Sequence, residues 1–319
     1  MGSGLLPCYC VTSVGALITD AHISGVPSEV PMKTVLVTGV RGKTGRQVAA
    51  ALARRPGMEV RGAGRSVEQL DLHGVRAAPF NWEDQASWPG VLRGVQGIYL
   101  VKPKTPDPAA TVASFLRMAR DADRVVLLSE IGCGGRDETT DERKVEKVIE
   151  SAPVRWTILR PNWFMQNFTE PNFYLEAIRD AGELEVPAGG QPVSFVDTRD
   201  IADAAVSALL DSGHAGRAYT LTGPRALTFA EVAAQIGQAA GHRVRHADPP
   251  LADYLSALAA QGTATSVIGY YRRIYDHIQK RQTAIISPAI EHVTGHPPRT
   301  FSAFVEENKN LWRRTPAPP

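Results

Sequence analysis

Three glycines at a regular spacing form the first group of residues in this chain that could bind a ligand. Gly39, Gly42 and Gly45 follow the strand-like run 34–38 and precede residues 46–53, whose apolar members recur at helical spacing. Glycine in such a turn lets a phosphate group approach backbone N–H groups at the N-terminus of a helix, where a Cβ would hold it off. The turn therefore predicts a dinucleotide site, to which the intervening residues also belong: Arg41, Lys43 and Thr44.

Arg65 and Ser66 follow the next expected strand, 58–63, and lie where a dinucleotide site distinguishes its two common cofactors. An acidic side chain there accepts hydrogen bonds from the ribose hydroxyls of NAD, whereas arginine pairs with the additional phosphate of NADP. Arg41 is a second cation in the same region, and Ser66 adds a hydroxyl donor. Although arginine is common on any protein surface, this pattern favours NADP(H).

The glycine turn belongs to a repeated pattern of strands and helices. Further strands are expected at 75–80, 97–101, 124–129 and 156–161, and helices at 82–92, 111–122 and 141–151. Repeats of this length are typical of an α/β fold with a doubly wound parallel Rossmann sheet, whose ligand lies beyond the carboxyl ends of the strands. Asn81, Lys102 and Ser129 stand at such strand ends, so we add them to the cofactor site.

The second half of the chain has a different pattern. One late strand is expected at 218–222, and helices at 229–240, opened by a Thr228/Glu231 capping box, 251–260, 267–279 and 301–312. We therefore expect an NADP(H)-binding core over 32–168. Residues 169–319 should form a smaller, mainly helical substrate lobe that is interleaved with the sheet and caps the cleft. Residues 1–31 are interpreted as an extension that is loosely held or that precedes a native start at Met32.

Composition excludes several functional classes. The 319 residues carry 35 Lys and Arg against 33 Asp and Glu, with no block of like charges that would attract nucleic acid or an anionic membrane. The apolar part of residues 1–31 lacks a basic flank and is interrupted by polar residues, unlike a signal peptide or membrane span. We expect a small-molecule substrate as the partner, no nucleic acid and no membrane.

Cysteine and histidine do not form a pattern typical of a metal site. The three cysteines, Cys8, Cys10 and Cys133, fit neither a disulfide framework nor a paired metal knuckle, which favours a reducing cytoplasm. His292 and His296 have the spacing of a helical ligand pair, but Gly295 and Pro297 argue against a continuous helix there. We therefore assign no metal.

Several blocks together resemble the atypical short-chain dehydrogenases of the NmrA-like group, and within it the clavine (festuclavine/agroclavine) dehydrogenase branch. The blocks are residues 35–45, 80–82 with 87–88, 98–101, 124–129 and 159–167, and Asp200-Ile201-Ala202 and Trp312 extend the likeness through most of the chain after Met32. The resemblance implies an NADP(H)-dependent reductase that transfers a hydride to an iminium carbon or a similarly polarised double bond.

The usual acid of this fold is absent. Carbonyl reduction ordinarily uses a Tyr-x-x-x-Lys pair, in which lysine lowers the pKa of the phenol that donates a proton. None of the eight tyrosines is followed by lysine four positions later, and near the usual place the chain has Arg143 and Lys147. The sequence therefore assigns no catalytic residue.

Three interpretations of this absence stay open. In the first, the substrate is a cation such as an iminium, so hydride addition neutralises it and no proton donor is required. Aromatic walls could then come from Trp163, Phe164 and Phe168, and negative charge from Glu130 or Glu170. Core packing and surface exposure are ordinary roles for these residue types. In the second, the enzyme reduces a quinone or an enone, and water or Lys102 supplies the proton. In the third, the protein is a non-catalytic NADP(H)-binding redox sensor of the NmrA-like type.

Overall fold

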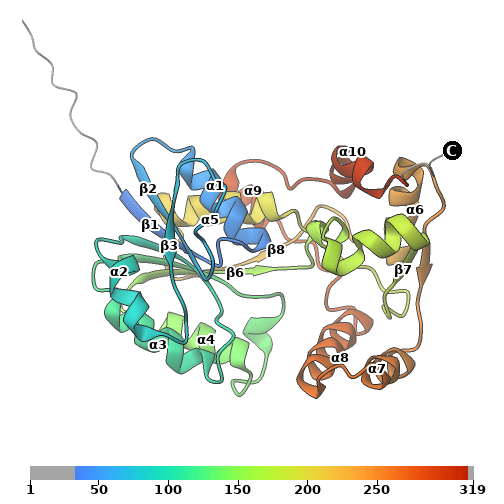
Figure 1. Ribbon diagram of the computed structural model, residues 1–319, viewed down its shortest axis with the longest axis horizontal. Helices are drawn as coiled ribbons and strands as arrows, with labels where there is room; N and C mark the ends of the chain where they lie inside the picture. The colour runs from blue at the N-terminus through green and yellow to red at the C-terminus, as the bar shows by residue number, and fades with distance from the viewer. Residues whose placement is uncertain (1–32, 315–319) are drawn as a thin grey trace, which may run out of the picture. The chain divides into compact units, whose positions relative to one another are not determined.

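A seven-stranded parallel sheet organises the part of the chain that the computed structural model describes, residues 33–314 (Figure 1). The expectations about residues 1–31 and a start at Met32 lie outside these residues. The strands of the sheet are β1 (Lys33–Thr38), β2 (Met58–Gly64), β3 (Val75–Pro79), β4 (Gly97–Val101), β5 (Arg124–Leu128), β6 (Arg155–Pro161) and β8 (Arg217–Leu221). Their spatial order is β3-β2-β1-β4-β5-β6-β8, and every neighbouring pair is parallel. The predicted doubly wound sheet is confirmed.

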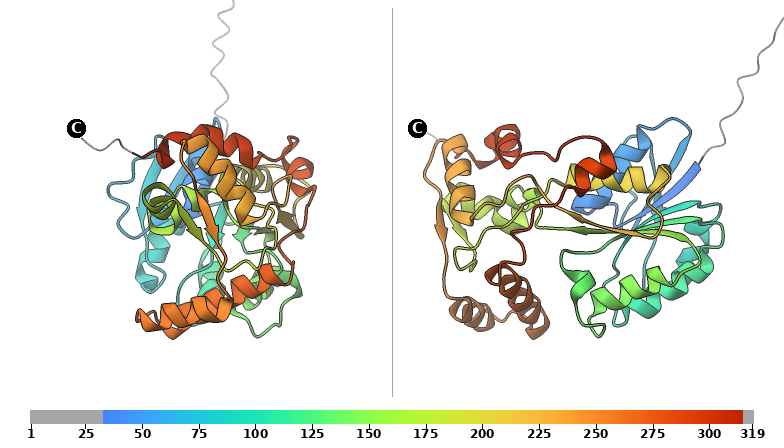
Figure 2. Two further views of the ribbon diagram at one scale, coloured as in Figure 1. Left: turned by 90° about the vertical axis from the view of Figure 1, so that its right-hand side faces the viewer. Right: turned by 180° about the vertical axis from the view of Figure 1, so that it is seen from behind.

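Helices cover both faces of this sheet (Figures 1 and 2). One layer contains α1 (Lys43–Ala53), α5 (Thr198–Leu210) and α9 (Ala289–Thr294), and the other contains α2 (Trp88–Leu92), α3 (Pro108–Met118) and α4 (Asp141–Glu150). Two fully buried clusters result, because side chains alternate between the faces of a strand. In β1, Val35 and Val37 pack toward one cluster while Leu36 packs toward the other. The nearly continuous apolar strands are explained by this double cover.

The remaining elements surround a third apolar cluster. They are α6 (Phe229–Ala240), α7 (Leu251–Ala260), α8 (Thr265–Gln279), α10 (Phe301–Trp312), the parallel pair β7 (Glu183–Glu185) and β9 (Arg245–Ala247), and the helical turns η3 (Met165–Phe168), η4 (Pro171–Leu175) and η5 (Ala177–Ala181). Phe168, Phe195, Phe229 and Trp312 are fully or almost fully buried in this cluster. The predicted capping box is present, with Glu231 N–H donating to the Thr228 hydroxyl and Thr228 N–H donating to the Glu231 carboxylate.

Element boundaries differ from the predictions where local capping decides them. The helix expected at 82–92 is a 3-10 turn, η1 (Gln85–Ser87), followed by α2, because Asp84 caps the turn and Pro89 stands near the start of α2. Helix α3 begins earlier than expected, at Pro108, where Asp107 accepts a hydrogen bond from Ala110 N–H. The sequence analysis did not predict α5 or α9.

Among the helices between residues 33 and 314, none combines the length and apolar character that crossing a bilayer requires.

Candidate functional site

The glycine turn after β1 is shaped by contacts between backbone atoms. Gly39 has a φ of +64°, and Gly42 N–H donates to the Gly39 carbonyl over 2.8 Å. A Cβ on Gly45 would lie 2.3 Å from the same carbonyl oxygen, so this position accepts no side chain. Val101 packs against Gly39, and the Thr38 hydroxyl joins β1 to β4 by accepting from Val101 N–H and donating to the Tyr99 carbonyl.

The turn leads into a helix end that is suited to an anion. Gly42 is the N-cap of α1, no side chain caps the helix, and its first turn contains no acidic residue. Uncapped N–H groups and the positive end of the helix dipole favour a phosphate at this position. A cradle that a Cβ would fill, in front of an uncapped helix, fits the pyrophosphate of a dinucleotide.

The predicted phosphate-binding arginines stand beside this turn. Arg41, Arg65 and Ser66 are all exposed, and Arg41 Nη1 donates to the Ser66 carbonyl over 3.3 Å. Ser66 has a φ of +51°, an uncommon conformation for a residue with a side chain. The Arg41–Ser66 hydrogen bond places the residues after β2 beside the glycine turn, so the structure brings the three predicted residues together.

Asn81 follows β3 in a turn fixed by its backbone. Its N–H donates to the Ser87 hydroxyl over 3.2 Å, and its carbonyl accepts from Trp88 Nε1 over 2.9 Å. Phe80 N–H donates to the Gly64 carbonyl, so this turn lies directly beside the end of β2. Asn81 is thus placed at the same edge of the sheet as Arg65.

Lys102 and Ser129 lie at the ends of β4 and β5, and both are held by glutamates of α4. Lys102 Nζ is 2.6 Å from Glu142 Oε1, and the Ser129 hydroxyl donates to Glu146 Oε1 over 2.6 Å. The Ser129 hydroxyl therefore donates its proton to the Glu146 carboxylate, and its oxygen can accept a hydrogen bond from another group.

Glu146 is the centre of a buried ionic cluster that the sequence analysis did not identify. It is fully buried and accepts hydrogen bonds from Ser129, from Arg160 Nε and Nη2 at 2.9 and 2.8 Å, and from Arg143 Nη1 at 2.7 Å. Burial opposes ionisation of Glu146, but the hydrogen bonds from Arg160 and Ser129 outweigh it and hold the pKa of Glu146 below its ordinary value. Arg143 also pairs with Glu150, so the residue near the usual acid position is a fixed guanidinium.

The predicted substrate-lining residues divide into two groups. Trp163 and Phe164 are half-buried beyond the end of β6, and the Trp163 ring packs against Phe229 and Tyr275 with centroid distances of 5.8 and 6.0 Å. Phe168 is fully buried in the third cluster, and its carbonyl accepts from Trp312 Nε1. The assignment of Phe168 to a ligand wall is therefore corrected, because its ring is enclosed by other aromatic side chains.

Glu130, the acidic residue among the predicted substrate-lining residues, already has a partner. Glu130, which follows Ser129, forms an ion pair with Arg136, and its side chain keeps 31% of its surface exposed. A carboxylate at this place can still face a bound molecule, but its charge is partly compensated.

Two contacts bring the C-terminal segments onto the ends of the strands, and neither was predicted. The Lys43 ammonium lies 3.6 Å from the centroid of the Phe173 ring, and burial lowers the pKa of Lys43 although nearby Glu170 opposes the shift. On α8, the His277 ring lies against Gly132, where an added Cβ would be 2.7 Å from it. Both contacts depend on residues more than 100 positions apart in the sequence, so no local pattern indicates them.

One cluster of side chains that could bind a metal ion is already paired with an arginine of the protein. Asp200, Asp203 and His296 place ligand atoms within 4.8 Å of one another, but Arg299 forms ion pairs with both aspartates. Helix α9 contains His292 but ends at Thr294, so His292 and His296 are not on one helix.

Comparison with known families agrees with this geometry. The NAD(P)H-binding family matches residues 39–212, and the NmrA-like family matches residues 141–304. The chain belongs to the NmrA-like family of NAD(P)H-binding proteins. The predicted family and the predicted class of cofactor are thereby confirmed.

Relatives of this NmrA-like protein include named reductases. It is 30% identical to the NAD(P)H azoreductase of Xenophilus azovorans over 279 residues, covering 85% of this chain and 96% of that protein. It is 28% identical to the agroclavine dehydrogenase of Claviceps fusiformis over 291 residues, covering 88% and 98%. The predicted likeness to clavine dehydrogenases is confirmed, and the family context is that of NAD(P)H-binding oxidoreductases.

A solved structure shares the fold. The NADPH-dependent quinone oxidoreductase of Escherichia coli, solved with NADPH, superposes with a TM-score of 0.72 at 20% identity and covers 86% of this chain and 99% of that one.

Proposed function

We propose that this protein is an NADP(H)-dependent reductase that transfers a hydride to an iminium carbon or a similarly polarised double bond of a small molecule. The observation that carries the proposal is the identity of the groups near the usual acid position. Arg143 is held by Glu146 and Glu150, and the pKa of its guanidinium is raised, first by the hydrogen bond that it donates to Glu150. A group of this kind does not donate a proton, so a substrate that needs none is favoured.

The chain's own residues then have distinct roles. When bound, the cofactor supplies the hydride. The glycine turn and the start of α1 hold the pyrophosphate, while Arg41 and Arg65 pair with the additional phosphate of NADP. Ser129, whose proton is donated to Glu146, can accept a hydrogen bond from the carboxamide of the nicotinamide or from the substrate.

The substrate walls follow from the same edge of the sheet. The half-buried rings of Trp163 and Phe164 offer aromatic faces, and Glu130 offers negative charge, to a cation bound beyond β5 and β6. Addition of hydride to an iminium carbon forms a C–H bond and moves the π electrons onto nitrogen, so a neutral amine results without proton transfer.

Cofactor preference is tested by the variant Arg65→Ala. Loss of a charge-assisted phosphate pair should weaken NADPH binding about tenfold and leave NADH binding nearly unchanged. Titration of both cofactors into the native protein, into this variant and into a control Arg117→Ala on the exposed face of α3 measures the effect. Equal weakening of NADPH binding and NADH binding would mean that Arg65 supports the turn and does not bind the additional phosphate.

The reaction is tested by following NADPH consumption with three acceptors: an N-methyl dihydroisoquinolinium salt, a simple quinone and an azo dye. We expect turnover with the iminium and a kcat that stays flat from about pH 6 to 9, because no protein group must donate a proton. Tight NADPH binding without turnover of any acceptor would contradict the proposal and favour the sensor interpretation.

A second candidate is reduction of a quinone or azo compound. The specific observation in its favour is the 30% identity with an NAD(P)H azoreductase along almost the whole of both chains. In the same assay, turnover of the quinone or the dye with a kcat that falls as pH rises would support this candidate over the first.

A further inference from the structure

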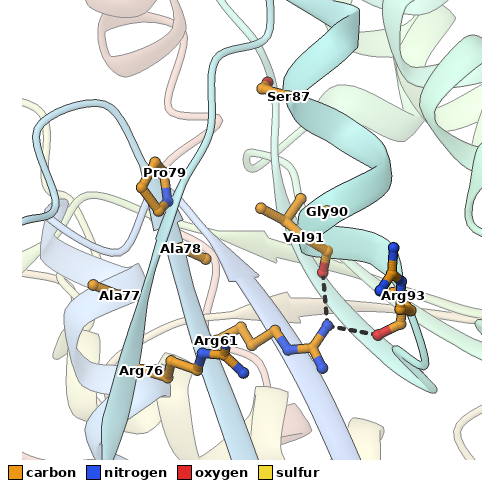
Figure 3. A pocket seen from close by; sticks show the side chains of 9 residues that line it. All are labelled: Arg61, Arg76, Ala77, Ala78, Pro79, Ser87, Gly90, Val91 and Arg93. Carbon is orange, nitrogen blue, oxygen red and sulfur yellow. Dashed lines mark hydrogen bonds between the residues drawn. The ribbon is translucent and has the colours of Figure 1, made fainter.

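A basic pocket lies between the edge strand β3 and helix α2 (Figure 3). It has a volume of about 440 Å³, and every charged residue that lines it is an arginine: Arg61, Arg76 and Arg93. None of its lining residues belongs to the glycine turn or to the other cofactor candidates. We refer to it as the arginine pocket.

Arg61 is fixed in position by the surrounding backbone. Its side chain is 14% exposed, Nε donates to Glu59 over 2.8 Å, and Nη1 donates to the carbonyls of Val91 and Arg93 over 3.2 and 2.6 Å (Figure 3). These carbonyls lie at the end of α2, where helix carbonyls lack intrahelical partners. Nη2 makes no hydrogen bond with the other residues that line the pocket and is available as a donor.

Arg76 and Arg93 provide charge that can move toward a ligand. Arg93 is exposed, and the Arg76 side chain is 74% exposed with a long contact of 3.5 Å to Glu59. Glu59 forms ion pairs with two of the three arginines, Arg61 and Arg76, and it does not itself line the pocket. The pocket has a net positive charge.

The rest of the lining is apolar and leaves space. Ala77, Pro79 and Val91 form much of the wall, and a Cβ added to Gly90 would meet nothing within 4 Å. A fixed arginine, two movable arginines and an apolar wall match a small molecule with a charged end and an apolar body.

The charged end of the pocket is separate from the cofactor edge of the sheet. Arg61 and Arg76 are paired in the register of β2 and β3, three positions before Gly64 and Pro79 at the carboxyl ends. At 3.3 Å per residue, this is a separation of about 10 Å along the strands. An anion bound there does not occupy the position of the pyrophosphate at the start of α1.

We propose that the arginine pocket is a second ligand site, which binds a small molecule that carries a phosphate or carboxylate group on an apolar body. The proposal is independent of the function proposed above.

The test uses phenyl phosphate as the probe, titrated calorimetrically into the full-length protein already saturated with NADPH, so that the cofactor's own phosphate sites are filled. We expect saturable binding of one probe per chain. The double variant Arg76→Ala/Arg93→Ala should weaken it at least tenfold. The control Arg117→Ala/Arg120→Ala, which removes the same charge from the exposed end of α3 and the turn after it, should not. Arg61 is left intact because it holds the end of α2.

A steric variant separates the pocket from general charge effects. Gly90→Phe places a ring in the empty space without altering charge, and it should also weaken the probe at least tenfold. Circular dichroism and NADPH titration of each variant check that the fold is retained. Inorganic phosphate is the second probe, and it should bind more weakly than phenyl phosphate if the apolar wall takes part.

Three results would overturn the proposal: no saturable binding to the native protein, equal affinities in the arginine variant and its control, or full affinity in Gly90→Phe. Equal affinities for phenyl phosphate and inorganic phosphate would contradict the assignment of an apolar body and reduce the site to one for a simple anion.

Discussion

Gly45 has the most severe steric restriction among the glycines of the predicted turn. A methyl group there would overlap the Gly39 carbonyl, whereas one on Gly42 would lie 3.2 Å from the same oxygen. We expect Gly45→Ala to push α1 away from the turn and to weaken NADPH binding at least a hundredfold, with a smaller effect for Gly42→Ala. Fluorescence titration with NADPH measures both. Gly90→Ala, at an open position inside α2, is the control and should bind NADPH normally while gaining about 0.5 kcal/mol of stability.

Individual residues were predictable from the sequence where their chemistry is local. The glycines, Arg41, Arg65 and Ser66 follow directly from strand ends and spacing, and the structure places them together. Phe168 was assigned wrongly, because a ring that lines a ligand and a ring that fills a core have the same sequence signature. Glu146 was missed because a glutamate in a helix is ordinarily solvated, and its burial depends on Arg160, which comes from β6.

Helix α4 is anchored to the sheet by the ion pair between Glu146 and Arg160 of β6. Glu146→Gln leaves Arg160 without a charged partner in a buried position, and we expect it to lower the free energy of unfolding by about 3 kcal/mol. Urea denaturation monitored by circular dichroism provides the measurement. Glu138→Gln, which breaks an exposed ion pair between Lys147 of α4 and a residue that precedes the helix, should leave the midpoint unchanged. Similar midpoints for the two variants would show that the buried cluster contributes little to stability.

Helix α8 is docked partly through an uncharged His277. Burial lowers the pKa of His277, and repulsion by Arg136 acts in the same direction, while Glu130 opposes it. A lowered pKa in the folded state means that the stabilisation is complete above the unfolded value of about 6.5 and is lost as pH falls through the folded value. The free energy of unfolding should therefore decrease from pH 7.5 to about 5.5 with a slope of at most 1.4 kcal/mol per pH unit from this group.

The comparison of His277→Gln with native protein isolates this contribution. Denaturation midpoints measured across the same pH range should depend less on pH in the variant. His73→Gln, at an exposed loop position, is the matched control and should keep the native profile. Identical profiles for all three proteins would exclude a role for His277 in the acid sensitivity of the fold.

Elements were predictable where an apolar run is bounded by turn residues. The strands of the sheet, α7 and α10 were located to within two residues for this reason. Helix α5 was missed although Asp197 caps it, since its alanine-rich run shows a weak contrast between faces and becomes buried through contacts with α1 and α9. The 3-10 and π-type turns between residues 165 and 181 have no period that a sequence pattern can detect.

Over the whole molecule, the sequence predicted the sheet and its ligand edge because repeated strand–helix units form a parallel sheet whose ligand lies beyond the carboxyl ends of the strands. It could not predict which C-terminal segments approach that edge. The contacts of Phe173 with Lys43 and of α8 with Gly132 join parts of the chain whose separation leaves their pairing to tertiary packing.

Cofactor binding should stabilise the entire fold, since the site is assembled from turns after several strands and the start of α1. A ligand that binds the native state at about one hundred times its Kd adds about 2.7 kcal/mol to the free energy of unfolding. We expect a rise in melting temperature with NADPH and a smaller rise with the same concentration of NADH in a scanning calorimetry experiment. A larger shift with NADH would contradict the assignment of Arg65 to the additional phosphate.

The absence of a side-chain cap on α1 has a consequence for the rate at which the first amide hydrogens of this helix exchange with solvent. Its first turn starts from a glycine that offers no oxygen to the adjacent N–H groups, so an incoming phosphate completes the hydrogen bonding that the sequence leaves out. The amide hydrogens of Thr44 and Gly45 should exchange rapidly with solvent deuterium in the cofactor-free protein and slowly once the dinucleotide is bound. In this sense the ligand supplies the cap that the sequence of α1 leaves out.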